Sequence, residues 1–120
     1  MCSNIISIKD NIISIKDNMN DFVITIGKNA IDNINILDRA DKNDLWFHVE
    51  NSSSSHVIIH SCNNIIIPKN LIYRAAILCK KHSKLSKMKN ISVIYTEVMN
   101  VTKMEKIGSV TTIKTKTIIV

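Results

Sequence analysis

Apolar residues along the chain recur with two different periods, and each period predicts a different kind of element. Short runs that alternate apolar and polar residues, or that are rich in β-branched residues, predict strands. These runs lie at residues 22–26, 45–49, 57–60, 91–95, 98–101, 109–113 and 117–120. The pattern therefore places strands from the first quarter of the chain to its last residues.

Longer runs with apolar residues every three or four positions predict two helices. The clearer helix opens at Pro68, a residue favoured in a first helical turn, and is expected over about residues 68–82. A shorter helix is expected over about residues 29–37, with Ala30, Ile34 and Leu37 on one face. Strands at both ends of the chain with helices between them predict a single α+β domain with a largely antiparallel or mixed sheet.

One heptapeptide, Asn-Ile-Ile-Ser-Ile-Lys-Asp, occurs twice in succession, over residues 4–10 and 11–17. Each copy can form a short strand, so the two copies can form an N-terminal hairpin. Two copies are too few for a solenoid, which needs about three repeats. We expect residues 1–20 to be a duplicated strand segment, residues 21–120 to be the main part of the domain, and one copy to be dispensable for folding.

Positive charge is concentrated in the second half of the chain. Residues 1–60 carry a net charge of −3, whereas residues 61–120 carry +9. A basic half indicates a polyanionic partner, either a nucleic acid or an anionic surface. The alternative is that solvated lysines only keep a small domain soluble. The densest basic group lies on the polar side of the second helix and just beyond it, at Lys80, Lys81, Lys84 and Lys87.

Several functional classes are disfavoured by composition. The chain has only two glycines, which excludes glycine-rich phosphate loops. The three cysteines form no Cys-x-x-Cys pair, so neither a zinc site nor a disulfide framework is expected. No stretch approaches the ~20 apolar residues of a membrane span, and no secretory signal is visible. We expect a cytoplasmic protein that does not contact membranes.

The segment from Asp44 to Val49 and the nearby His56 gather the rarest residue types, including the only Trp. By strand alternation, Asp44, Trp46 and His48 share one face, and the apolar residues between them share the other. We expect the apolar set to face the core and Trp46 to be displayed. An Asp–His hydrogen bond there would raise the His pKa and tighten polyanion binding as the pH falls from about 8 to 6. The alternative is that Trp46 and Phe47 straddle the sheet and the histidines only form structural hydrogen bonds.

Spacing disfavours a metal site and a catalytic pair among these residues. Asp44, His48, His56 and His60 match no known metal motif, and adjacent Ser55 and His56 would point to opposite faces of a strand. We therefore expect no metal, no other cofactor and no catalysis. Residues 27–29 fit a strand-to-helix turn that either binds an anion or serves only as a turn. Tyr95 either stacks on a base or packs inward.

The order of short motifs along the chain resembles the signature of the NFACT-R domain, the RNA-binding module of NFACT proteins. The motifs are Gly27-Lys28-Asn29, Asn33, Asp44 to His48, Ser55-His56-Val57, Ser83-Lys84, Val93 to Thr96, Val101-Thr102-Lys103 and Gly108-Ser109-Val110. The chain is also similar to the N-terminal domain of a group of eukaryotic coiled-coil-domain proteins. It departs from the NFACT-R pattern at Lys28, Ile34 and Ser54, where Arg, Asp and Gly are typical.

The resemblance implies a stand-alone domain that binds RNA without turnover, in a setting of translation or ribosome-associated quality control. Transfer or ribosomal RNA is the expected partner, with ribosome association, and DNA is the second candidate. The residues expected to contact phosphate are Lys28, Lys80, Lys81, Lys84, Lys87 and Lys103. The residues expected to contact bases or complete the site are Asn29, Asp44, Trp46, His48, Ser55, His56, Ser83 and Tyr95. The alternatives are a protein-interaction module and a metal-assisted enzyme.

Overall fold

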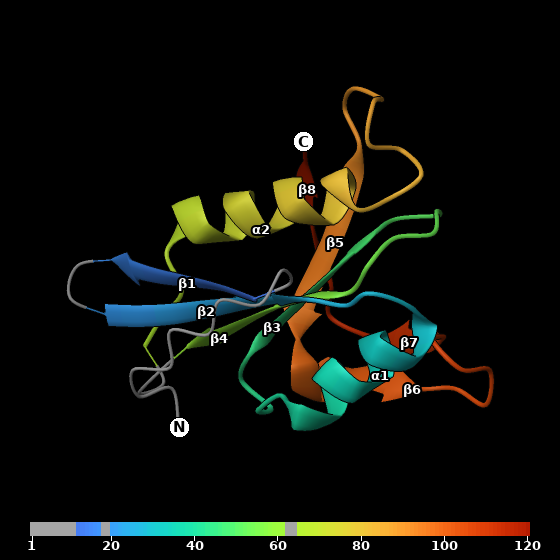
Figure 1. Ribbon diagram of the computed structural model, residues 1–120, viewed down its shortest axis with the longest axis horizontal. Helices are drawn as coiled ribbons and strands as arrows, with labels where there is room; N and C mark the ends of the chain where they lie inside the picture. Colours follow the sequence, from blue (N-terminus) through green and yellow to red (C-terminus); the bar gives the residue numbers. More distant parts are fainter. Residues whose placement is uncertain (1–11, 18–19, 62–64) are drawn as a thin grey trace.

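The computed structural model describes residues 12–17, 20–61 and 65–120, and in them the chain has the expected α+β architecture. One antiparallel sheet has the strand order β1-β2-β4-β3-β5-β8. Its strands are β1 (Ile12–Asp17), β2 (Asn20–Ile26), β3 (Leu45–Val49), β4 (Val57–Ser61), β5 (Ser92–Glu97) and β8 (Lys116–Ile119). A separate hairpin is formed by β6 (Val101–Lys103) and β7 (Val110–Thr112). The sheet is flanked by helices α1 (Ala30–Arg39) and α2 (Lys69–Lys81) (Figure 1).

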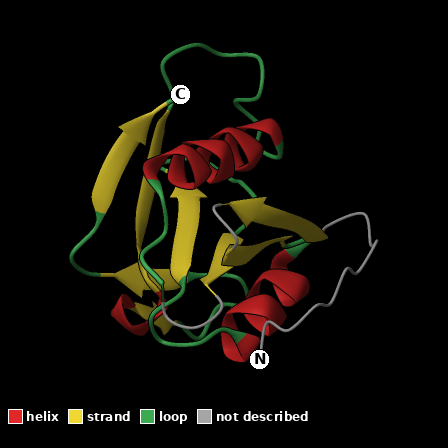
Figure 2. Ribbon diagram, turned by 90° about the vertical axis from the view of Figure 1, so that its left-hand side faces the viewer, coloured by secondary structure: helices red, strands yellow, loops and turns green. Residues whose placement is uncertain are grey.

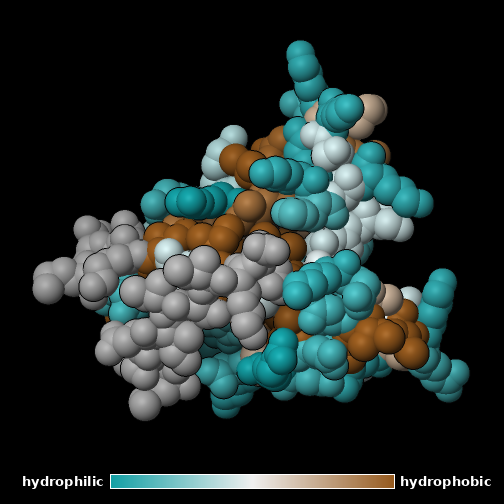
Figure 3. Space-filling view, viewed as in Figure 1, coloured by the Kyte–Doolittle hydropathy of each residue, from teal (hydrophilic) through white to brown (hydrophobic). Residues whose placement is uncertain are grey.

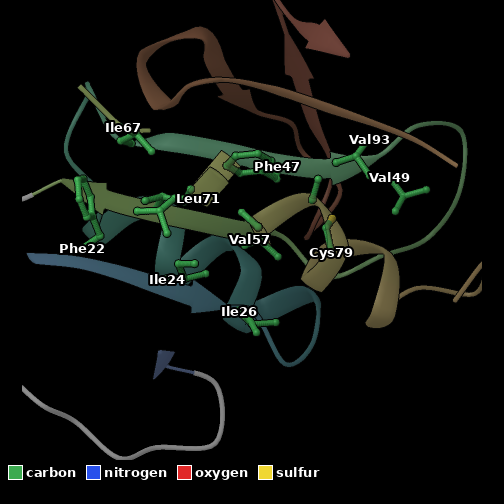
Figure 4. Packing of buried hydrophobic residues seen from close by; sticks show 13 residues of the cluster. Phe22, Ile24, Ile26, Phe47, Val49, Val57, Ile67, Leu71, Cys79 and Val93 are labelled. Carbon is green, nitrogen blue, oxygen red and sulfur yellow. The ribbon is translucent and has the colours of Figure 1, made fainter. Parts of the chain in front are cut away.

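Helix α2 covers one face of the sheet, and the larger core lies beneath it (Figures 2 and 4). Leu71, Ala75, Ala76 and Cys79 are buried on the inner side of the helix, as the apolar periodicity predicts. They pack against alternate residues of the central strands, namely Phe22, Ile24, Ile26, Phe47, Val49, Val57, Ile59 and Val93. Because side chains alternate between the two faces of each strand, one face of the sheet presents a continuous apolar surface to the helix.

The opposite face of the sheet is covered as well, by α1 and by the 3-10 turn η2 (Val98–Asn100). Trp46 is only 1% exposed there, in a second cluster with Ile36, Leu37, Ile58 and Val98. The expectation that Trp46 is displayed is therefore wrong. The alternation of β3 is as predicted, but its second face meets α1 and not solvent, so both Trp46 and Phe47 are buried.

Both predicted helices are present, but the predicted inner face is correct for α2 and only partly correct for α1. Helix α1 begins after Asn29, whose side chain accepts a hydrogen bond from the Asp32 N–H at 2.8 Å and caps the helix. Its buried residues are Asn33, Ile36 and Leu37, whereas Ala30, expected on the inner face, is exposed. The prediction erred because it followed apolar residues only, and a buried amide occupies one inward position.

Most of the strand expected over residues 98–101 is a 3-10 turn. Residues 98–100 form η2, and only Val101 continues into β6. The amide of Val98 donates to the carbonyl of Asp44 at 2.8 Å, and the amide of Met99 donates to the carbonyl of Lys42 at 3.0 Å. These bonds to the α1–β3 loop turn the chain out of the sheet directly after β5.

The second copy of the repeated heptapeptide supplies β1, which pairs antiparallel with β2 at the edge of the sheet. The first copy, and with it the hairpin that the two copies can form, lies outside the described residues. Within the described ranges, no helix has both the length and the apolar character needed to cross a membrane.

Deleting residues 4–10 should change the free energy of unfolding by less than about 2 kcal/mol, a large value for a single change. Because the copies are identical, deletion of either one yields the same chain, which keeps a strand to pair with β2. Deleting residues 4–17 is the control, because it removes both copies and uncovers the β2 edge. Urea unfolding of the three proteins measures the difference. Equal losses from the short and long deletions would show that both copies are structural.

Candidate nucleic-acid interface

A polar cleft of about 760 Å³ lies where six separate segments meet. The segments are the start of α1, the middle of β3, the β3–β4 loop, the turn after α2, the middle of β5 and the β6–β7 hairpin. In Figure 1 these segments converge on the side of the molecule away from the β1–β2 turn. Figure 3 shows residues of weak polarity gathered between the end of α2 and α1 on that side.

The α1 side of the cleft depends on close packing around Gly27. A Cβ at Gly27 would clash with the side-chain oxygen of Asn33, so the close approach requires glycine. The same Asn33 oxygen accepts the His56 N–H at 3.1 Å, and the Gly27 N–H donates to the His56 carbonyl at 2.9 Å. The turn therefore places the exposed Lys28 on the cleft wall.

The β3–β4 loop forms a serine-rich wall that is bonded to the turn after α2. Asn51 adopts the left-handed backbone conformation, with a φ of 60°. Ser54 occupies the position where the resemblance predicts glycine, and its hydroxyl accepts the Val49 N–H at 3.1 Å. The Ser55 N–H donates to the His82 carbonyl at 3.1 Å, and the Lys84 N–H donates to the Ser53 carbonyl at 3.3 Å. These bonds hold Lys84 on the cleft wall directly beside the loop.

The floor of the cleft is built from Trp46, His48 and His56. Trp46 Nε1 donates to His56 Nδ1 at 3.1 Å, and the Trp46 and His48 rings are parallel with centroids 5.8 Å apart. His48 Nδ1 donates to the Val49 carbonyl at 2.6 Å. The buried indole therefore positions both imidazoles without being open to a base itself.

The two floor histidines are held neutral by burial. Desolvation, with a smaller contribution from the charge of the neighbouring His48, lowers the pKa of His56 to about 4. Desolvation also lowers the pKa of His48, although its hydrogen bond to Val49 acts in the opposite direction. The predicted increase in a histidine pKa is therefore wrong, because neither ring is bonded to Asp44.

Asp44 lies at the other end of β3 and has a structural role. It is 3% exposed, and its Oδ2 atom accepts the Asp41 N–H at 2.9 Å and lies 2.7 Å from His60 Nδ1. Four residues of strand, about 13 Å, separate it from His48. Within the described ranges, no group of three His, Cys, Asp or Glu residues is arranged to hold a metal ion.

Eight of the fourteen predicted site residues line the cleft, and six do not. Those that line it are Lys28, Asn29, Trp46, His48, Ser55, His56, Ser83 and Lys84. Those that lie elsewhere are Asp44, Lys80, Lys81, Lys87, Tyr95 and Lys103. Tyr95 stacks on Phe47 beneath α2 at 5.2 Å between centroids, and Lys103 pairs with Asp38 at 2.7 Å. Tyr95 is therefore directed to the core side of the sheet.

Several cleft residues were not among the predicted site residues, although Asn33 and Ser109 belong to the motifs of the resemblance. They are Asn33, Ser52, Ser53, Ser54, His82, Ser109 and Thr112. The β6–β7 hairpin reaches the cleft by packing Gly108 against Ala30. Gly108 has a φ of +86°, and a Cβ there would lie 2.8 Å from the Ala30 Cβ. A polar residue beside a glycine, Gly108-Ser109, was the available signal for this wall.

The low pKa of His56 predicts an acid-dependent loss of stability. Between pH 6.5 and about 4 the unfolded state binds a proton that the folded state does not, so stability falls as the pH falls through this range. The His56→Asn variant retains an acceptor for the Trp46 N–H but does not titrate. Between pH 7 and 5 the wild type should lose about 2 kcal/mol more than the variant. Urea unfolding at both pH values measures this, and equal losses would contradict a neutral buried His56.

Comparisons with known proteins agree with the geometry. Residues 12–113 match the family described as NFACT protein RNA binding domain. Coiled-coil domain-containing protein 25 of Bos taurus is 35% identical over 86 residues, which cover 68% of this chain and 41% of that protein. The Mus musculus protein of the same name is 33% identical over 86 residues, again 68% of this chain and 41% of that protein. The chain thus spans about two fifths of the length of these curated relatives.

A solved structure has the same fold. It is described as the structure of the C-terminal of the fibronectin/fibrinogen-binding protein from Streptococcus suis. It superimposes with a TM-score of 0.80 and 26% identity, and the match covers 95% of this chain and 46% of that one. Because the family match includes most of the sheet, both helices and every wall of the cleft, the chain belongs to the NFACT RNA-binding domain family.

Proposed function

We propose that this chain binds single-stranded RNA in the polar cleft, with backbone phosphates at Lys28 and Lys84. The observation that carries the proposal is that both lysines line one cleft but come from segments more than fifty residues apart. Family membership supports RNA as the polyanion. The two lysines and the family membership therefore both support RNA binding in this cleft.

The dimensions of the cleft favour an unpaired strand. Its volume of about 760 Å³ is that of a small-ligand site and admits one or two nucleotides but not a duplex. Unpaired RNA bases and sugars can be splayed into such a pocket, whereas a paired helix presents mainly its backbone. A loop or an end of transfer or ribosomal RNA has the required form.

The exposed lysines outside the cleft have a secondary role in this proposal. Lys81 and Lys87 are exposed near the end of α2 and raise the positive potential along the route to the cleft. Long-range charge of this kind accelerates association and is screened by salt. Lys103 is held by Asp38 and contributes less, because its charge is already paired.

A role in translation or ribosome-associated quality control is the broader proposal, and it rests on the family resemblance. Binding would be stoichiometric, with no chemical step. A protein-interaction module is the principal alternative, and salt dependence separates the two. Displacement of counterions from RNA makes affinity fall steeply with salt, whereas an apolar protein interface does not show this dependence.

Charge reversal of Lys28 and Lys84 together should weaken binding of a short single-stranded RNA and reduce its salt dependence. For two lost phosphate contacts, the magnitude of the log–log salt slope should fall by about 1.4. Fluorescence anisotropy at several salt concentrations gives both quantities. The matched control is the Lys69→Glu and Lys116→Glu variant, which makes the same charge change away from the cleft.

Two results would contradict the assignment. If the control weakens binding as much as the cleft variant, net charge and not the cleft determines affinity. If the Lys81→Glu and Lys87→Glu variant has the larger effect, the outer side of α2 and its following loop form the main contact. Circular dichroism of each variant establishes that the fold is retained.

A further inference from the structure

The two floor histidines have fixed and opposite hydrogen-bonding roles. His56 Nδ1 accepts the Trp46 indole N–H at 3.1 Å. Because the ring is neutral near pH 7, its proton must lie on Nε2. His56 therefore offers a single N–H donor at the far edge of its ring.

His48 has the other tautomer. Its Nδ1 atom lies 2.6 Å from the Val49 carbonyl oxygen, which can only accept, so Nδ1 carries the proton. Burial lowers the pKa of His48 and keeps the ring neutral. Its Nε2 atom therefore has a free lone pair and acts as an acceptor.

Both Nε2 atoms are available to a ligand. No protein group in the described part of the chain bonds either atom. The described residues also contain no fully buried side-chain nitrogen or oxygen without a partner, so both atoms retain contact with solvent. Both residues line the cleft, and His56 is only 2% exposed. A nearly buried ring thus presents one unpaired polar atom to the cleft.

The arrangement selects the chemical class of the ligand. A phosphate oxygen accepts hydrogen bonds and would be repelled by the His48 lone pair, so this floor is unsuited to phosphate. A hydroxyl can accept from His56 and donate to His48 with the same oxygen. The ring centroids are 5.3 Å apart, a spacing compatible with two bonds of about 2.8 Å to one oxygen.

We propose that His48 and His56 read the 2′-hydroxyl of an RNA ribose whose neighbouring phosphates lie at Lys28 and Lys84. This inference rests on the proposed function and deepens it, because it makes the cleft selective for RNA over DNA. The ribose 2′-hydroxyl is both donor and acceptor, and it is the group that distinguishes the two nucleic acids. Trp46 covers one face of the His48 ring, and readout uses the ring edges that carry the two Nε2 atoms.

The test is an anisotropy series with one short oligouridine carrying 2′-hydroxyl, 2′-hydrogen, 2′-fluoro or 2′-O-methyl sugars. The 2′-fluoro sugar retains the pucker of RNA but cannot donate to His48. Wild type should bind the hydroxyl form about five- to tenfold more tightly than the fluoro and hydrogen forms, the range of one net hydrogen bond. The bulkier 2′-O-methyl form should bind no better than the fluoro form.

Two substitutions at one position make the test specific. His48→Asn retains a group near Nδ1 but has nothing at the Nε2 position, and it should abolish discrimination between the hydroxyl and fluoro forms. His48→Gln extends an amide to the Nε2 position and should retain most of it. His60→Asn, outside the cleft and beside Asp44, is the matched control and should discriminate like wild type.

The outcomes separate this inference from the proposed function. Binding that depends on Lys28 and Lys84 but is equal for all four sugars would overturn the 2′-hydroxyl assignment and leave RNA binding intact. If the affinity does not depend on the 2′ group but differs between oligouridine and oligoadenosine, the histidines read a base edge instead. Absence of binding to every oligonucleotide would overturn both. If His48→Asn does not fold, the wild-type sugar series still decides.

Discussion

The hydrogen bonds that link His56 to the α1 turn determine the geometry of the whole cleft. His56 donates its amide proton to Asn33 and receives the Gly27 N–H on its carbonyl, while its ring accepts from Trp46. One residue of the β3–β4 connection is thereby joined to α1 and to the centre of the sheet. Buried polar groups must be paired or they destabilise the fold, so these partners constrain one another. Loss of the Asn33 amide would leave the buried His56 N–H unpaired and would free the wall that carries Lys28.

Burial of both sheet faces explains why a small domain can hold two neutral histidines. Helix α2 covers one side and α1 covers the other, and Trp46 fills the second layer. A ring placed against that layer loses hydration, which favours its uncharged form. The positive charge of the cleft therefore comes from the lysines at its walls, whereas the floor is polar and neutral. In the proposed complex, attraction to phosphate and selection among sugars are therefore performed by different groups.

The spacing of apolar residues along the sequence predicted the elements that depend on local periodicity. It did not predict the contacts between segments that are distant in the chain. Alternation in β3 and the apolar side of α2 follow from residue spacing, and both are observed. The burial of Trp46 depends on α1 and η2, which approach from elsewhere in the chain. Asp44 and His48 lie on one face of the predicted strand but bond to different segments. Asp44 pairs with His60, so the predicted pairing with His48 or His56 was wrong. Asn33 was noted as a motif residue but not assigned to the site, because an amide in a helix gives no periodic signal.

The departures from the family pattern are accommodated by local bonds. Ser54 replaces a glycine, yet its hydroxyl accepts the Val49 N–H and so stabilises the loop that a glycine would leave freer. Lys28 replaces an arginine, which exchanges a bidentate fork for a mobile point charge. A point charge holds a phosphate without fixing its orientation. In a cleft of this kind, orientation must then come from the floor, where the His56 donor and the His48 acceptor are held in place by Trp46 and Val49. In the proposed complex, a lysine in place of arginine therefore leaves specificity to the histidine pair.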